Sequence, residues 1–140
     1  MALHSLPAEH LGTLTATVRQ PFNVIENGPT GTRRGTATVT AAAFEGPRIK
    51  AAMPEGVAGG DWWVLRADGV AALDVRLNLV TDDGAEIFVT YLGLNVDGVL
   101  KVSPRFETGD DRYTWLNSVF AVGIGAPVGD DGVRYEIYAL

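Results

Sequence analysis

Turn-forming residues recur along this chain at intervals too short for long helices. Its 140 residues include 17 glycines and 7 prolines. The segments between the turn signals are short and rich in Val, Thr, Leu, Ile and Tyr, and none carries a long apolar stripe at helical spacing. This pattern predicts many short strands joined by tight turns. The turn signals occupy residues 27–31, 54–60, 68–69, 82–84, 97–98, 109–111 and 129–132.

Eight or nine antiparallel strands with no helix to cover a face must close into a barrel or stack as a sandwich. The clearest hairpin joins residues 70–81 to 85–94 through an Asp-Asp-Gly turn. We expect one domain over residues 11–140, preceded by a flexible segment over residues 1–10. The expected strands are Leu11–Gln20, Gly35–Glu45, Ile49–Ala52, Trp62–Arg66, Val70–Thr81, Ala85–Leu94, Leu100–Arg105, Tyr113–Gly123 and Val133–Leu140.

Charge and composition exclude several classes of protein. The net charge of −6 and the pI near 4.7 argue against a nucleic-acid surface, which needs clustered Lys and Arg. The chain has no cysteine, which removes thiolate nucleophiles and Cys-ligated metals. No basic stretch followed by an apolar run marks a signal peptide, and no apolar run is long enough to span a bilayer. We therefore expect a cytoplasmic protein without membrane contact.

The stretch 72-ALDVRLNLVTDDG-84 alternates with a period of two. Leu73, Val75, Leu77 and Leu79 share one side, and the opposite side carries Asp74, Arg76 and Asn78. The alternation by itself favours polar side chains facing solvent, as is usual in antiparallel sheets. The other interpretation is that the polar row lines the inside of a barrel, which can hold one small ligand.

Five stretches in register resemble the bacterial and fungal family of domain-of-unknown-function 3237. They are 28-GPTGTRR-34, 45-EGPRIKAAMPEGVAGGDW-62, 73-LDVRLNLVTDDGAEIFVTYLG-93, 105-RFETGDDRYTWLN-117 and 123-GIG-125. The resemblance covers the chain from about residue 10 to its end. It implies a closed antiparallel β-barrel of about eight strands with little helix, similar to calycins and allene oxide cyclase.

The resemblance also implies which residues occupy family motif positions, and it favours the inward orientation of Asp74 and Arg76. Inside a barrel the two charges would need each other as partners, because an isolated buried charge is costly. Asp74 could then act as a base beside a cation that holds an oxygenated substrate, or the two could be a structural ion pair. The motif positions are Arg33, Asp61, Trp62, Asp74, Arg76, Glu107, Tyr113, Trp115 and Asn117.

The segment 113-YTWLN-117 is expected to place Tyr113, Trp115 and Asn117 on one face of a strand. The phenol and the amide could then donate to a developing oxyanion. Alternatively Trp115 fills the core and Asn117 satisfies the backbone at a turn. Glu107 lies in a loop signal, as a second candidate carboxylate or as a cap of the turn.

Gly59 and Gly60 allow a bend that could aim Asp61 at the barrel mouth, although a turn Asp often bonds to its own backbone. Trp62 and Trp63 face opposite sides, so at most one lines a cavity; Trp62 is the residue assigned to it, with Tyr91. Arg33 could hold an anion at the rim or be a solvated charge. We expect no metal site. Asp82 and Asp83 are typical of a hairpin turn, and a calcium site needs more oxygen ligands at set spacing.

The sequence leads to a primary hypothesis and two alternatives. The first is a cofactor-independent isomerase, cyclase or lyase acting on a small oxygenated apolar molecule. Its catalytic residues would be Asp74, Arg76, Glu107, Asp61 and Tyr113, and its ligand-binding residues Arg33, Trp62, Tyr91, Trp115 and Asn117. The second is a non-catalytic carrier of a small hydrophobic ligand. The third is a filled barrel whose exposed Trp mediates a homodimer.

Overall fold

Antiparallel pairs of strands close into a ring. The structure is a computed structural model and describes residues 4–140. Its strands are β1 (Glu9–Val18), β2 (Asn23–Ile25), β3 (Arg33–Gly46), β4 (Ile49–Ala52), β5 (Gly59–Asp61), β6 (Val64–Leu65), β7 (Ala71–Thr81), β8 (Glu86–Val96), β9 (Val99–Glu107), β10 (Ala121–Val128) and β11 (Gly132–Ala139). Two short 3₁₀ helices accompany them, η1 (Pro29–Gly31) and η2 (Asp111–Ser118).

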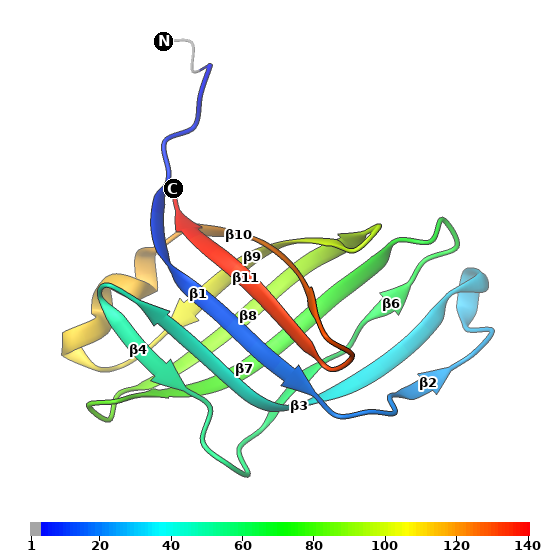
Figure 1. Ribbon diagram of the computed structural model, residues 1–140, viewed down its shortest axis with the longest axis horizontal. Helices are drawn as coiled ribbons and strands as arrows, with labels where there is room; N and C mark the ends of the chain where they lie inside the picture. Colours follow the sequence, from blue (N-terminus) through cyan, green and yellow to red (C-terminus); the bar gives the residue numbers. More distant parts are fainter. Residues whose placement is uncertain (1–3) are drawn as a thin grey trace.

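The strand order makes the molecule a closed antiparallel barrel with eight strand positions (Figure 1). Strands β7 to β11 pair in sequence, β11 pairs with β1, and β1 pairs with β3. The gap between β3 and β7 is filled by β4, β5 and β6 in succession, which together occupy one position. Strand β2 continues the position of β1 along β3. The sequence expectation of a closed barrel of about eight strands is confirmed.

Tight turns set the register of the long hairpins. The β7–β8 hairpin turns through Asp82, Asp83 and Gly84, and Gly84 has a φ of 95°. The β8–β9 hairpin turns through Asp97 and Gly98, both with positive φ. Positive φ at these positions is what two-residue hairpin loops require, and Asn, Asp and Gly tolerate it best.

Three expected segments differ from the observed ones, and in one of them the expected strand Trp62–Arg66 is reduced to β6 (Val64–Leu65). The expected strand Tyr113–Gly123 is wrong over its first half, where η2 forms and β10 starts only at Ala121. The cause is local, because the Asp110 carboxylate accepts a hydrogen bond from the backbone N–H of Arg112 and caps the helix. Strand β1 begins at Glu9, inside the segment expected to be flexible, and residues 1–3 of that segment lie outside the described residues.

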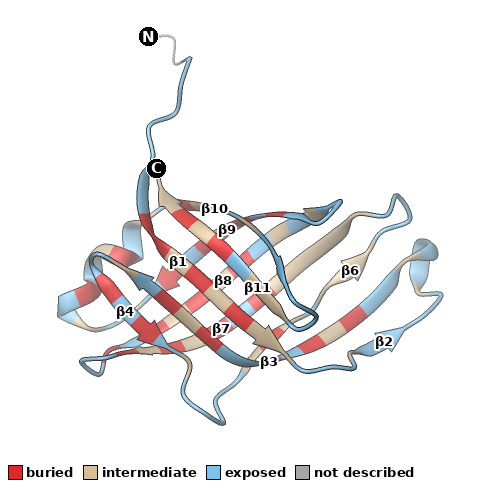
Figure 2. Cartoon of the chain, in the orientation of Figure 1, coloured by how far each residue is buried: buried red, intermediate tan, exposed pale blue. Residues whose placement is uncertain are grey.

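Alternate residues of each strand point into the barrel, so buried and exposed bands follow one another along the ribbon (Figure 2). One end, which we call the packed end, is covered by η2 and filled with large side chains. There Phe44 and Phe106 stack with their ring centroids 5.4 Å apart. The opposite end, near β2 and β6 in Figure 1, is the open end. The packed-end side chains are Phe44, Leu79, Ile87, Phe106 and Leu116.

Candidate functional site

The open end of the barrel contains a cavity of about 290 Å³. This volume lies near the lower limit of small-molecule sites in proteins, about 300–1,000 Å³. Its walls are mostly aliphatic and aromatic, with inward-facing residues from β1, β3, β7, β8 and β11. Because few polar side chains border the cavity, the positions of these few determine where a ligand can place its own polar groups. The polar or partly polar residues are Arg33, Asp61, Trp63, Tyr91, Asn95 and Tyr135.

Asp61 is the one carboxylate that borders this cavity. At the end of β5 its Oδ1 accepts a hydrogen bond from the backbone N–H of Asp74, at 3.0 Å. In a continuous antiparallel ladder, the Asp74 N–H would donate to the backbone carbonyl of Trp62. Here the Asp61 carboxylate accepts that hydrogen bond instead, and β5 ends at Asp61. Within residues 4–140 this is the only hydrogen bond of the carboxylate, so Oδ2 is available to a ligand.

Burial gives Asp61 an unusual acidity. Its pKa is raised from 3.8 to about 6, mainly by desolvation, although the hydrogen bond from the Asp74 backbone acts in the opposite direction. The charge of the Asp74 side chain adds a smaller upward effect. A carboxyl group with a pKa near 6 is present in both protonation states around neutral pH. It can therefore serve as a general acid or a general base.

Two tyrosines lie beside Asp61. Tyr91 on β8 and Tyr135 on β11 meet edge to face, with ring centroids 5.4 Å apart. Burial raises the pKa of Tyr91 well above its usual value, and it raises the pKa of Tyr135 to about 12. The charge of Asp61 contributes to both shifts, which reflects how close the three groups are. Both phenols are neutral at physiological pH and can donate hydrogen bonds to an oxygen of a ligand.

Trp63 forms a flat wall of the cavity. Its indole lies directly on the backbone of Gly35, where a Cβ atom would fall 1.9 Å from the ring. Phe22 meets the same indole edge to face, with centroids 5.9 Å apart. The indole Nε1 is buried and has no hydrogen-bond partner among the described residues. Glycine at position 35 is therefore required for the indole to pack as it does.

Arg33 lies at the rim, at the start of β3. Its Nε donates to Glu26 Oε1 at 2.8 Å, and both side chains are about half exposed. Of the residues selected from the sequence, Asp61, Tyr91 and Arg33 are thus brought together around one cavity. Their roles in catalysis or binding stay predictions.

The expectation that Asp74 and Arg76 point into the barrel is wrong. Their side chains are 42% and 57% exposed, and the Arg76 guanidinium lies 3.9 Å from the Asp74 carboxylate on the outer surface. The inward positions of β7 belong to Leu73, Val75 and the leucines that follow. The physical reason is the ordinary one for antiparallel sheets, since aliphatic side chains gain more from burial than a charged pair does.

Trp62 is also on the outside, so the choice between the two adjacent tryptophans was wrong. It is 39% exposed, and the Arg76 guanidinium lies 5.3 Å from the centroid of its ring. Trp63, its neighbour, is the residue that lines the cavity. The period-two spacing of Asp61, Trp63 and Leu65 was the available signal, because these three residues share the inward face.

Glu107, Trp115 and Asn117 lie away from the cavity, at the packed end. The Asn117 amide accepts from the Thr108 backbone N–H at 2.8 Å and donates to the Thr108 carbonyl at 3.0 Å. Trp115 packs partly against the core, with the Arg48 guanidinium 3.7 Å from its ring centroid. Glu107 is exposed beside Asn117 on the outer surface. The expected aromatic wall is therefore absent, because η2 replaces the strand that would have formed it.

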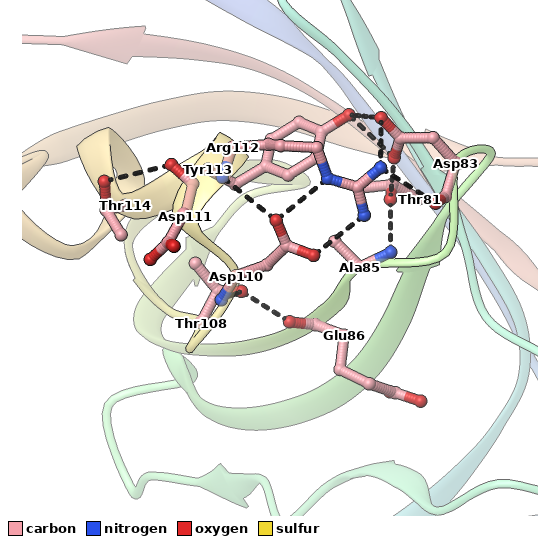
Figure 3. A network of polar contacts seen from close by, with 10 residues as sticks. All are labelled: Thr81, Asp83, Ala85, Glu86, Thr108, Asp110, Asp111, Arg112, Tyr113 and Thr114. Carbon is pink, nitrogen blue, oxygen red and sulfur yellow. Dashed lines mark hydrogen bonds and ion pairs between the residues drawn. The ribbon is translucent and has the colours of Figure 1, made fainter.

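Tyr113 belongs to a polar network that fastens η2 to the β7–β8 turn (Figure 3). Its hydroxyl donates to the Asp83 carboxylate at 2.9 Å, and this bond raises the pKa of Tyr113. Thr81 Oγ1 donates to the same carboxylate at 2.5 Å. Arg112 pairs with Asp110 at 2.8 Å and holds the pKa of that carboxyl at about 2. Tyr113 therefore links η2 to the β7–β8 turn and does not border the cavity.

Sequence reasoning did not select Tyr135, which is 1% exposed and lies deep in the barrel. The alternation of Val133, Tyr135 and Ile137 on β11 predicts an inward row, but it does not distinguish a core tyrosine from a site tyrosine.

Within residues 4–140, no three His, Cys, Asp or Glu side chains gather as a metal site would require. No helix of that part of the chain is long and apolar enough to cross a bilayer.

Solved structures of other proteins share this fold. A β-barrel-like protein from Acinetobacter baumannii AYE superposes with a TM-score of 0.84, at 26% identity and with 99% of each chain covered. An enzyme from Penicillium herquei superposes with a TM-score of 0.66 at 24% identity, covering 96% of this chain and 99% of that one. The second likeness concerns the fold alone.

Sequence relatives span most of the chain. A UPF0311 protein of Rhodopseudomonas palustris is 26% identical over 141 residues, covering 87% of this chain and 89% of that protein. The hydroalkoxylation enzyme phnH of Penicillium herquei is 33% identical over 87 residues, which cover 61% of this chain and 53% of that enzyme. The family model described as "Protein of unknown function (DUF3237)" matches residues 7–99 and 96–140. The chain therefore belongs to the DUF3237 family, as its motifs indicated.

Proposed function

We propose that this protein is a cofactor-independent enzyme that transfers a proton on a small, largely apolar, hydroxyl-bearing molecule, in a ring closure or an isomerisation. The observation that carries the proposal is Asp61, a carboxyl group whose pKa is raised to about 6 at the wall of an apolar cavity. Groups with perturbed pKa values in clefts are candidates for acid–base catalysis. The likeness to a hydroalkoxylation enzyme supports addition of a hydroxyl group across a carbon–carbon double bond as the reaction type.

The proposed step needs no group beyond those at the cavity. Protonated Asp61 gives its proton to one alkene carbon, and the π electrons form the new C–H bond. The substrate hydroxyl oxygen bonds to the other alkene carbon, and the O–H proton returns to the Asp61 carboxylate. The product is an isomer of the substrate, and Asp61 ends as it began.

The neighbouring groups suit this step. Tyr91 and Tyr135 stay neutral because burial raises their pKa values, so they can donate hydrogen bonds that orient the attacking hydroxyl. The apolar walls offer few hydrogen-bond partners to water, which favours reaction with the internal hydroxyl. Trp63 provides a flat surface against which an unsaturated substrate can stack.

The experiment uses ortho-prenylphenol, a small phenol with a reactive alkene, in deuterated water. Ring closure gives the dimethylchroman, with one deuterium on the carbon that accepts the proton, and NMR detects both. We expect turnover by the unmodified protein and loss of turnover in Asp61→Asn. Because the acid form acts, turnover should fall as the pH rises through about 6.

The matched control is Asp74→Asn, which removes a carboxylate only one strand away but on the outer surface. It should keep turnover. Absence of ring closure by the unmodified protein, or equal turnover in Asp61→Asn, would overturn the proposal. If the unmodified protein binds the phenol without converting it, the mostly apolar cavity favours the alternative of a carrier for small hydrophobic ligands.

A further inference from the structure

The cavity has polar groups at two different depths, and strand register measures the separation. On β3 the inward row runs from Arg33 through Gly35 to Ala37. Arg33 pairs with Leu65 at the rim, and Ala37 pairs with Asp61 farther in. Four residues of strand separate the two levels, a rise of about 13 Å. The cavity thus presents a cation at its mouth and a carboxyl group at its inner level.

Arg33 retains donors for a ligand. Only its Nε takes part in a hydrogen bond within the described part of the chain, to Glu26. The two terminal nitrogens of the guanidinium have no hydrogen-bond partner among residues 4–140. Planar guanidinium groups bind carboxylates through two parallel hydrogen bonds, so the free edge suits an acidic group.

The existing partner of Arg33 is weakly held. Glu26 has a side chain that is 61% exposed, and that of Arg33 is 46% exposed. Exposed ion pairs of this kind are weak, because water screens both charges. A ligand carboxylate at the rim can therefore share or displace Glu26. Among the residues that border the cavity, Arg33 is the one cation.

Between the two levels the wall is aromatic and flat. Trp63 accepts a hydrogen bond from the Gly35 backbone through its carbonyl, at 3.0 Å, which places it midway between Arg33 and Ala37 in register. Its indole covers Gly35. A planar, conjugated body would stack here, whereas a branched aliphatic one would leave the ring face unused.

We propose that the ligand class is a small aromatic or conjugated hydroxy acid. Its hydroxyl end lies at Asp61, its flat body lies along Trp63, and its carboxylate stays at the mouth with Arg33. Arg33 is then the residue that selects acids over neutral analogues. The assignment of the inner end rests on the proposed function, whereas the assignment of the outer end depends only on the cavity and Arg33.

The test compares para-hydroxycinnamic acid with its methyl ester, which keeps the ring and the hydroxyl but loses the negative charge. Isothermal titration calorimetry at pH 7.5 measures both. We expect the acid to bind about threefold to fivefold more tightly than the ester, because water partly screens the contact with the half-exposed Arg33. Arg33→Gln should remove this preference by weakening the acid alone.

Arg34→Gln is the matched control. Arg34 is the next residue, also exposed, but its guanidinium contacts the Trp62 carbonyl at 3.4 Å on the outer face. This variant should keep the preference for the acid. Equal binding of acid and ester, an unchanged preference in Arg33→Gln, or binding of neither probe at millimolar concentration would overturn the proposal.

These titrations, combined with the turnover measurements, separate this inference from the proposed function. Asp61→Asn should keep the preference for the acid, because the substitution lies at the inner level. If Asp61→Asn leaves turnover of ortho-prenylphenol intact while Arg33→Gln removes the acid preference, the catalytic role of Asp61 fails and the anchor at Arg33 stands. If turnover requires Asp61 but acid and ester bind alike, the anchor fails and the catalytic role stands.

Discussion

The packed end and the open end of the barrel are built from the same strands, yet only one of them is hollow. On β3 the inward positions carry Phe44 at the packed end, but Gly35 and Ala37 at the open end. The η2 helix adds Leu116 to the packed end, whereas short strands and loops surround the other. The difference shows that side-chain size, on a continuous backbone, creates the cavity and places one carboxyl group beside it.

The largest expected effect comes from emptying the packed end. Phe44→Ala removes a ring that is 1% exposed and stacked on Phe106, so we expect a loss of about 3–5 kcal/mol in the free energy of unfolding. Leu73→Ala, at the cavity wall, should cost less than half as much because it borders existing space. Urea denaturation measures both. Equal losses would mean that the two ends are packed alike.

Asp61→Asn should stabilise the protein at high pH. The folded-state pKa of about 6 lies above the unfolded value of 3.8, so the stability linked to this group is complete below pH 4 and is lost as the pH rises through 6. Two pKa units correspond to about 2–3 kcal/mol. The variant should therefore exceed the unmodified protein by that amount at pH 8 and match it at pH 3.

The measurement is urea denaturation of Asp61→Asn and of Asp74→Asn at both pH values. Asp74→Asn serves as the control for removal of a nearby charge, since its side chain is 42% exposed. A constant difference between Asp61→Asn and the unmodified protein across this pH range would contradict a buried, ionisable Asp61.

Filling the two ends should have unequal consequences. Ala37 borders the cavity and Ala42 lies nearer the packed end, and both face inward on β3. Ala42→Phe should cost about 1–3 kcal/mol through overpacking, whereas Ala37→Phe should cost less and should block the binding of para-hydroxycinnamic acid. Thermal unfolding and calorimetry distinguish the two. Unimpaired binding in Ala37→Phe would place the ligand elsewhere.

The smallest effect is expected on the outer row. Arg76→Gln removes the contact with Asp74 at 3.9 Å and the packing on Trp62. Exposed pairs of this kind contribute about 0–1 kcal/mol, and salt reduces them further. Stability, binding and turnover should therefore stay close to those of the unmodified protein. A loss of turnover comparable with that of Asp61→Asn would mean that the catalytic site lies on the outer surface, at Asp74 and Arg76.

The barrel and most of its strands could be predicted from the sequence, because period-two alternation and Gly-containing turns are local signals. Strand Ile49–Ala52 agrees with the expected bounds, and β7, β8 and β11 agree within two residues. The segment Tyr113–Ser118 was not predicted, because its alternation resembles a strand. The contact of Tyr113 with Asp83 joins residues thirty positions apart, which no local pattern contains, whereas the Asp110 cap is a local signal of a helix start that the prediction did not use.

The site could be predicted only in part. Asp61, Tyr91 and Arg33 were selected from the sequence, and all three border the cavity. Trp63 and Tyr135 also border it, but they were not selected. The error at Asp74 and Arg76 has a clear physical origin. The alternation alone indicated that their row faces water, and the aliphatic row of β7 fills the core as that alternation requires.

The most direct test of a functional open end is the acidity of Asp61 itself. Carbon-13 NMR of the side-chain carboxyl groups, recorded as a function of pH, follows each aspartate, and comparison with Asp61→Asn assigns the signal. We predict that the signal lost in the variant has a midpoint near pH 6. A midpoint near 3.8 for that signal would mean that Asp61 is solvated, and it would contradict the account of the cavity as an acid–base site.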